Sequence, residues 1–130
     1  AGRLKSHRAR ALLFDRGRKL RYGHFLVIYY VDRASTQPCH VQIAVSAPKK
    51  RYRKAVTRHY YQRVQREVYR TRSGVLRRLA QQYRARILLT FVYTGPDPVP
   101  FAELARQQAA LLVLLEESLV QYLNRFRKRH

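Results

Sequence analysis

The segment from Val41 to Arg70, VQIAVSAPKKRYRKAVTRHYYQRVQREVYR, decides the fold. From Cys39 to Ser46, apolar residues alternate with polar or small ones, which predicts a strand with one buried face. Pro48 ends this strand, because proline has no N–H to donate to a sheet. A basic loop follows, and the residues after it predict a helix from about Lys54 to Arg70.

The predicted helix has an apolar side and a basic side. At 100° per residue, the packing stripe consists of Val56, Tyr60, Val64 and Val68. The other side presents Arg58, His59, Gln62, Arg63, Arg66 and Arg70. The loop before the helix adds Lys49, Lys50, Arg51, Arg53 and Lys54. Such a loop and helical face can follow an RNA phosphate backbone, and Tyr52 within the loop is predicted to stack on an unpaired base.

Two elements are expected before this segment. Ser6 can cap a short helix that runs through Phe14 and ends at Gly17. Aromatic and β-branched residues from Tyr22 to Val31 predict a strand, and turn-forming residues follow from Asp32 to Pro38. We expect this first strand to pair antiparallel with the strand that follows the loop.

Three elements are expected after the segment. Ser73 and Gly74 interrupt the helical pattern, and a weaker helical piece continues to about Tyr83. The apolar run from Ile87 to Tyr93 predicts a buried strand, and the longest helix is expected from Phe101 to Leu123. This order predicts an α+β fold, a small sheet with helices. If the last strand lies parallel to the second, the basic helix is the crossover between them.

The composition indicates a polyanionic partner. The chain has 130 residues, with 28 Lys or Arg against 7 Asp or Glu, a formal net charge of +21 and a pI of about 11.3. Residues 1–95 hold 23 of the basic residues and three carboxylates, whereas residues 96–124 hold one Arg and four carboxylates. With 46% hydrophobic residues the chain can still bury a core. We expect one RNA-binding domain over residues 1–124 and a basic C-terminal tail over residues 125–130.

The cysteine content and the lengths of the apolar runs predict where in the cell the protein acts. Cys39 is the single cysteine, so an internal disulfide is excluded and a reducing, cytoplasmic environment is expected. The longest apolar runs are much shorter than the ~20 residues that span a bilayer. We therefore expect no membrane partner. The alternative is that the basic ends of the chain associate with an anionic membrane surface.

Side chains for catalysis are scarce in the basic part of the chain. Its three carboxylates are far apart in sequence, and the histidines show no metal-binding spacing, so we expect neither catalytic residues nor a metal site of the protein's own. Two histidines with a lysine could in principle form an acid–base ribonuclease, and His40 with His59 is the pair to test. Isolated glycines exclude a glycine-rich phosphate loop.

The segment from Ser46 to Arg70 resembles the signature of the bacterial ribonuclease P protein component, S-x-P-K-R-x-x-K-K-A-V-x-R-N-R-I-K-R-x-x-R-E-A-Y-R. The residues that match in register are Ser46, Pro48, Lys49, Lys50, Lys54, Ala55, Val56, Arg58, Arg63, Arg66, Glu67, Tyr69 and Arg70. Further agreement comes from RLK at Arg3–Lys5, from Phe14 and Gly17 in an F-x-x-G arrangement, and from the late FVYTG. The resemblance covers nearly the whole chain.

This resemblance implies an α/β-sandwich with a left-handed βαβ crossover. It also implies a protein cofactor of an RNA enzyme that removes the 5′ leader of precursor tRNA, with Mg²⁺ held through the RNA subunit. The partners would be ribonuclease P RNA and precursor tRNA, without a preference for DNA. Candidate contacts to the single-stranded leader are Phe14 and Tyr29, or Tyr30 if the strand register differs by one.

The chain departs from the signature at its most characteristic turn. His59 and Tyr60 stand where the family has Asn and Arg, and Gln62 stands where a Lys is usual. Tyrosine cannot make the bidentate phosphate contact that arginine makes. The alternative is therefore a diverged, non-catalytic RNA-binding or ribosome-associated protein with the same fold.

Overall fold

The structure, a computed structural model, describes residues 2–3, 7–32, 41–48, 52–96 and 99–128. These residues form one sheet and four helices. The strands are β1 (Gly2–Arg3), β2 (Arg18–Tyr22), β3 (Phe25–Asp32), β4 (Val41–Ser46) and β5 (Arg86–Tyr93). The helices are α1 (His7–Arg16), α2 (Ala55–Arg72), α3 (Gly74–Gln82) and α4 (Phe101–Lys128). The predicted α+β class is confirmed.

The sheet has the strand order β1-β4-β5-β3-β2. β5 pairs antiparallel with β3 and parallel with β4, so Leu89 lies between Tyr29 on one side and Ile43 on the other. The expected pairing of β3 with β4 is therefore wrong, because β5 inserts between them. An almost uninterrupted apolar sequence suits β5 to this central position, where both of its faces are buried.

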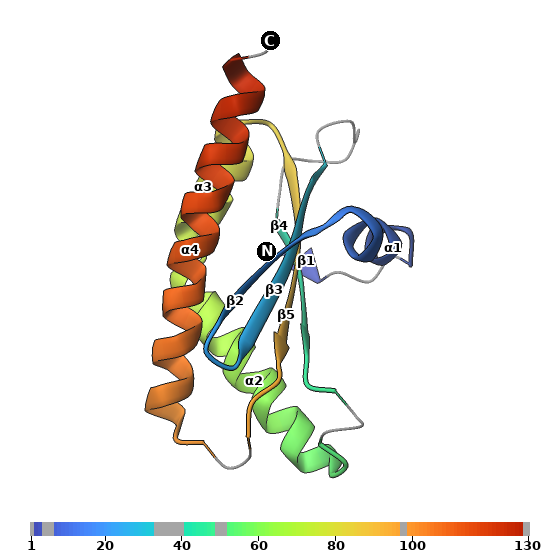
Figure 1. Cartoon of the computed structure of the whole chain (residues 1–130), viewed down its shortest axis with the longest axis vertical. Helices are drawn as coiled ribbons and strands as arrows, with labels where there is room; N and C mark the ends of the chain where they lie inside the picture. The colour runs from blue at the N-terminus through green and yellow to red at the C-terminus, as the bar shows by residue number, and fades with distance from the viewer. Residues whose placement is uncertain (1, 4–6, 33–40, 49–51, 97–98, 129–130) are drawn as a thin grey trace.

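Helices cover the two faces of the sheet unequally. α2, α3 and α4 lie on one face, whereas α1 covers part of the other (Figure 1). Alternate residues of the central strands point into the larger layer, namely Phe25, Val27, Tyr29, Val31, Ile87, Leu89, Phe91 and Tyr93. Leu13 of α1 packs against Ile28 and Leu88 of the sheet, and the three form a second, smaller cluster. On the same face, Leu26 and Val92 are half-buried.

The crossover from β4 to its parallel neighbour β5 consists of α2 and α3. They meet at Ser73, as the break in the sequence pattern predicts. Tyr61, Val64 and Val68 of α2 are buried against the sheet, but Val56 is 80% exposed. The predicted place of Val56 in the packing stripe is therefore wrong, because the first turn of α2 extends beyond the ends of the strands (Figure 1).

Two glycines set the path from α1 into the β2–β3 hairpin. A Cβ atom at Gly17 would lie 2.2 Å from the carbonyl oxygen of Leu13 and 2.7 Å from Cγ2 of Ile28, so only glycine allows this close approach. Gly23 turns the chain with a φ of 57°. The strand predicted from Tyr22 in fact begins at Phe25, because Tyr22 ends the separate strand β2.

α4 packs along the whole larger layer. Its predicted apolar positions are buried: Leu104, Leu111, Leu112, Leu115, Leu119 and Leu123. The helix continues to Lys128, past the expected end at Leu123, so the predicted tail starts as helix. Among the described residues, no helix is both long enough and apolar enough to cross a membrane.

Candidate nucleic-acid interface

The basic side of α2 is presented to solvent, as its sequence predicts. His59, Arg63, Arg66 and Arg70 are exposed, while Gln62 is half-buried. No acidic residue lies in the first turn of the helix, and Arg53 and Lys54 just before it are exposed. The helix dipole and these cations add up to a positive potential at the start of α2. The predicted contacts Lys49, Lys50 and Arg51 lie outside the described residues.

Arg58 has a structural task that sequence reasoning missed. Its Nη1 donates hydrogen bonds to the carbonyl oxygens of Tyr52 and Arg53, at 2.9 and 3.0 Å. The guanidinium group thereby closes the loop onto the first turns of α2. Since Arg58 is half-buried, it contributes both to the loop conformation and to the positive potential of this end.

The exposed arginines of α2 differ in their neighbours. The guanidinium of Arg63 lies 5.8 Å from the ring centroid of Tyr60, a cation–π contact. Arg70 pairs with Glu67 at 2.6 Å, and this hydrogen bond lowers the pKa of the Glu67 carboxyl. Among the described residues no carboxylate lies within 4.0 Å of the charged groups of Arg63 or Arg66. Arg63 and Arg66 are therefore exposed cations of α2 without a paired carboxylate among the described residues.

A cluster of three tyrosines anchors the start of α2. The rings of Tyr61 and Tyr93 stack with centroids 4.2 Å apart, and Tyr52 lies 5.6 Å from Tyr93 and 5.4 Å from Tyr61. The Tyr52 hydroxyl donates to the carbonyl of Gly95, and those of Tyr61 and Tyr93 donate to the carbonyl of Pro96. Tyr52 is only 4% exposed, so its predicted role in stacking on a base is wrong. Its apolar ring fills the junction between loop, helix and β5.

Two buried glutamines connect α2 to its neighbours. Nε2 of Gln65 donates to the carbonyl oxygen of Ser46 at 3.0 Å, which ties α2 to the end of β4. Nε2 of Gln108 on α4 donates to the carbonyl oxygen of Gln65 at 2.8 Å. Because each bond reaches a backbone carbonyl, the angle of α2 on the sheet is specified by polar as well as apolar contacts. The helix that carries the basic face is thus tied by hydrogen bonds to β4 and to α4.

The predicted leader contacts divide into exposed and buried side chains. Phe14 on α1 is 62% exposed and Tyr30 is half-buried on the same face of the sheet. Tyr29 points to the opposite face, is 3% exposed, and shares a hydrogen bond between its hydroxyl and that of Ser118. Of the two tyrosines, Tyr30 therefore keeps ring surface available to a strand.

β2 contributes basic residues that sequence reasoning also missed. Lys19 lies opposite Ile28 and Arg21 opposite Leu26, so both side chains share the α1 face of the sheet with these apolar residues. Both are exposed. The signal was present in the sequence, since Lys19 and Arg21 alternate with the apolar Leu20 and Tyr22. They border the uncovered part of the sheet with positive charge.

The described residues on the basic side of α2 and on the α1 face of the sheet carry side chains that can bind RNA. They contain no group of three or more His, Cys, Asp or Glu side chains placed to hold a metal ion. His59 is exposed on α2, and the other member of the predicted acid–base pair, His40, lies outside the described residues. What the geometry supplies is guanidinium and ammonium groups on rigid elements, with aromatic surface beside them. This combination suits an RNA strand.

One family model matches the sequence of this chain, and solved structures match its fold. The sequence matches the family model Ribonuclease P over residues 1–113. The fold matches the ribonuclease P protein of Staphylococcus aureus with a TM-score of 0.71 and 16% identity, covering 88% of this chain and 95% of that one. It also matches the protein from Thermotoga maritima with a TM-score of 0.66 and 20% identity, covering 90% and 97%. At these identities the structures show the fold alone. A search of curated proteins finds no match.

Proposed function

This chain belongs to the ribonuclease P protein family, and on that premise we propose that it binds the catalytic RNA and the 5′ leader of precursor tRNA. In this role it assists the maturation of tRNA 5′ ends. The site supports an RNA partner because exposed cations are held on a rigid helix. The observation on which the proposal rests is the exposed pair Arg63 and Arg66, neither of which forms an ion pair with a carboxylate among the described residues, within a matched family signature.

We assign cleavage itself to the RNA. The described exposed side of α2 carries cations, an imidazole, an amide and one carboxylate, that of Glu67, which is paired with Arg70. No group of three or more His, Cys, Asp or Glu side chains is placed there to supply the oxygen ligands that Mg²⁺ prefers. This donor set does not fit a magnesium site on the protein, so Mg²⁺ is proposed to be held through the RNA subunit. The side chains of α2 neutralise phosphates and orient the RNA. In this assignment no protein side chain exchanges a proton with the substrate.

The second proposed contact is to the leader. Phe14 and Tyr30 lie on the α1 face, where Lys19 and Arg21 border the half-buried sheet. A single strand can stack its bases on the aromatic rings while the cations contact its phosphates. Duplex RNA buries its base faces, so these contacts favour an unpaired leader.

Tyr60 gives the departure from the family signature a physical explanation. Where the family has an arginine, Tyr60 is half-buried, packs edge-on against Tyr61 at 5.2 Å and supports the guanidinium of Arg63. Tyrosine in place of arginine removes one cation, but its ring supports the guanidinium of Arg63 in one position. We therefore propose that the altered turn still binds RNA, and that the protein acts in the cytoplasm beside its RNA partner.

The proposal is tested by precursor-tRNA cleavage at low Mg²⁺ with the ribonuclease P RNA of the same genome. The reaction is run with and without the protein, on substrates with a leader of eight nucleotides or of one. We expect stimulation that is larger for the long leader. RNA binding without stimulation of either substrate would contradict the proposal and indicate a diverged RNA-binding protein.

A further inference from the structure

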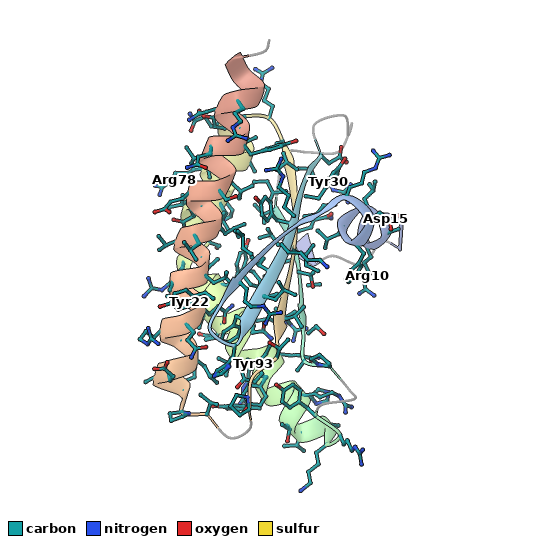
Figure 2. The ribbon with its side chains drawn as sticks, in the orientation of Figure 1. Arg10, Asp15, Tyr22, Tyr30, Arg78 and Tyr93 are labelled. Atoms are coloured by element: carbon teal, nitrogen blue, oxygen red, sulfur yellow. The ribbon has the colours of Figure 1, made fainter. Side chains whose placement is uncertain are left out.

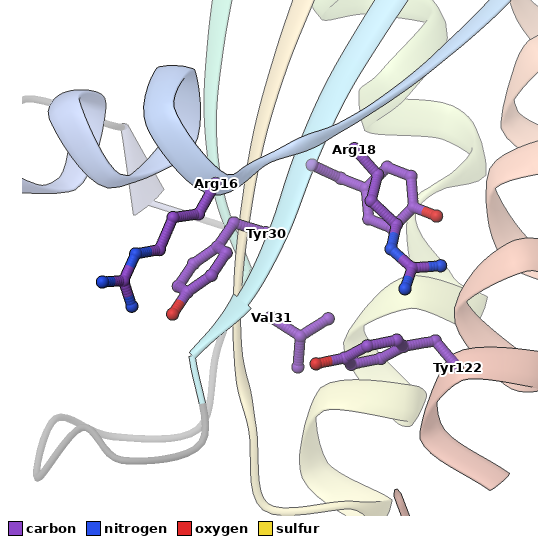
Figure 3. Close-up of a pocket in the computed structure, with 6 residues that line it drawn as sticks. Arg16, Arg18, Tyr30, Val31 and Tyr122 are labelled. Atoms are coloured by element: carbon purple, nitrogen blue, oxygen red, sulfur yellow. The ribbon is translucent and has the colours of Figure 1, made fainter. Parts of the chain in front are cut away.

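A pocket of about 180 Å³ lies between the end of α1, the end of β3 and the last turns of α4 (Figure 3). It arises from the lengths of two strands. β2 begins at Arg18, which pairs with Tyr29, so β3 runs on past the end of its neighbour. The pocket is lined by Arg16, Arg18, Tyr29, Tyr30, Val31 and Tyr122.

Aromatic rings form much of this lining. Tyr30 from the sheet and Tyr122 from α4 are both half-buried, so part of each ring is open to solvent. The guanidinium of Arg18 lies 5.1 Å from the ring centroid of Tyr122. The buried Tyr29, hydrogen-bonded to Ser118, connects β3 to α4 beside them. These contacts hold the α4 wall of the pocket in place before any ligand arrives.

The charge of the pocket is positive. None of its described lining residues is acidic, and Arg16 and Arg18 are both exposed. Arg125, also exposed, lies three residues after Tyr122 and therefore on the same side of α4. Two guanidinium groups at the rim can bind the phosphate that accompanies a base stacked on a ring.

The size of the pocket limits its ligand. Sites for small organic molecules and cofactors occupy roughly 300–1,000 Å³, so a volume of about 180 Å³ admits a single base rather than a dinucleotide. Base pairing would block entry, because a paired base is held inside a helix. The size of the pocket therefore fits one unpaired base.

The pocket is separate from the basic turn of α2. Figure 2 shows Tyr30 and Tyr93 towards opposite ends of the molecule, and Tyr93 belongs to the cluster that anchors the start of α2. Tyr122 also lies beyond residue 113, where the match to the family model ends. Membership of the family therefore does not by itself imply that α4 forms one wall of such a pocket.

We infer that the pocket formed by Arg16, Arg18, Tyr30 and Tyr122 binds one unpaired nucleotide of an RNA strand, as a contact point distinct from α2. This inference adds a subsite to the proposed function and rests on it for the presence of the RNA. The strand could be the distal part of a leader or a single-stranded segment of the catalytic RNA. Both offer the same base and phosphate, and binding measurements on the holoenzyme separate them.

The first experiment measures binding of a fluorescent uridine octamer to the full chain by anisotropy at 0.15 M salt. Tyr122→Leu and Tyr30→Leu should each weaken binding about tenfold through loss of stacking. Arg16→Gln should weaken it several-fold and flatten the salt dependence. Tyr83→Leu and Arg78→Gln, which change a half-buried tyrosine and an exposed arginine outside the pocket, are the matched controls. Equal affinity of all five folded variants would overturn the inference.

A crosslinking measurement needs no variant. An octamer of 4-thiouridine is irradiated with the unmodified protein, and the modified peptides are identified by mass spectrometry. We expect crosslinks at Tyr30 or Tyr122. Crosslinks found only on α2 would overturn the inference, even if a pocket variant failed to fold.

The second experiment uses the assembled holoenzyme and precursors with leaders of two or ten nucleotides. If Tyr122→Leu weakens binding of the ten-nucleotide precursor alone, the nucleotide comes from the leader. If it weakens binding of the protein to the catalytic RNA, the nucleotide comes from that RNA. No change in either affinity would overturn the inference. Failure of the unmodified protein to stimulate cleavage would instead contradict the proposed function, while the octamer measurements would still decide the pocket.

Discussion

The rings of Tyr61 and Tyr93 stack with their centroids 4.2 Å and their planes 15° apart, and this contact joins α2 to the end of β5. Tyr61 comes from the helix that carries the basic face, and Tyr93 ends the central strand. Both side chains are almost completely buried. The position of the RNA-binding helix therefore depends on an aromatic contact between residues 32 positions apart in sequence.

Tyr61→Ala should lower the free energy of unfolding by about 3–5 kcal/mol. The substitution leaves a cavity in the core and removes both ring stacking and the hydrogen bond to the carbonyl of Pro96. Urea denaturation followed by circular dichroism measures the effect. Tyr83→Ala, at a half-buried tyrosine outside the cluster, is the control and should cost less. A loss below about 1 kcal/mol for Tyr61→Ala would show that the cluster does not anchor α2.

Arg58→Ala should lower the free energy of unfolding more than Arg63→Ala does. Arg58 donates two hydrogen bonds to backbone carbonyls of the preceding loop, so its loss should cost about 1–2 kcal/mol. Within the described part of the chain, Arg63 has a cation–π contact alone, at an exposed position, and its loss should cost less than about 1 kcal/mol. Thermal unfolding of the two variants at the same pH and salt compares them. Equal losses of stability would refute the structural role of Arg58.

Arg63→Ala and Arg66→Ala should weaken binding to the catalytic RNA and reduce its salt dependence. Removing one cation that neutralises a phosphate lowers the slope of log K against log salt by about 0.7–0.9. Filter binding at several salt concentrations gives the slope. Arg78→Ala on α3 serves as a charge-matched control and should leave it unchanged. If the slope of Arg63→Ala and Arg66→Ala equals that of the unmodified protein, this side of α2 is not in the interface.

Val64→Ala separates binding from folding on the same helix. Val64 is 3% exposed, so removing its two methyl groups should cost roughly 2 kcal/mol of stability. Below the unfolding temperature, the slope of RNA affinity against salt should stay that of the unmodified protein. Stability and slope are read from chemical denaturation and filter binding. A changed slope would indicate that Val64 acts on the RNA-binding side chains.

Gln62→Lys should tighten RNA binding. Gln62 is half-buried on the basic side of α2 and stands where the family signature has a lysine. An added ammonium group beside Arg63 and Arg66 should raise the salt slope by up to about one unit. Gln62→Glu, which adds the opposite charge at the same position, is the matched control and should weaken binding. Equal affinities of the two variants would place this position away from the phosphates.

Alkaline pH should destabilise the protein through Tyr69. Burial raises the pKa of the Tyr69 hydroxyl from 10.0 to about 12, with a smaller opposing effect of Arg77. Between these values the unfolded chain has lost the proton while the folded chain keeps it, so the free energy of unfolding falls as the pH rises from 10 to 12. The buried hydroxyl has no hydrogen-bond partner among the described residues. Tyr69→Phe should therefore be at least as stable at pH 7 and lose less stability up to pH 12.

This pH effect is measured by denaturation at several pH values between 8 and 12. The tyrosine absorbance at 295 nm, followed in parallel, reports the ionisation of the phenols. Tyr22→Phe, at a half-buried tyrosine near the surface, controls for the loss of a hydroxyl group as such. If Tyr69→Phe loses as much stability between pH 10 and pH 12 as the unmodified chain, the pKa of Tyr69 does not account for the effect.

Local sequence patterns determined several features of this protein. Alternation predicted β4, apolar composition predicted β5, and the break at Ser73 predicted the division between α2 and α3. The helical period placed Arg63 and Arg66 on the exposed side of α2. These predictions hold because strand alternation and helical period depend on neighbours in the chain. The family signature could be read for the same reason, since it lies within one continuous segment.

Only the tertiary structure decided which strands pair and which aromatic rings are buried. β5 lies between β3 and β4 because both of its apolar faces are covered only in the centre of the sheet. The sequence of β3 itself does not indicate which strand will pair with it. Tyr52 looked like an exposed loop residue, but Tyr61 and Tyr93 enclose it. The pocket between Tyr30 and Tyr122 likewise joins residues 92 positions apart. Burial and strand order are determined by contacts between distant segments, whose free energies no local pattern contains.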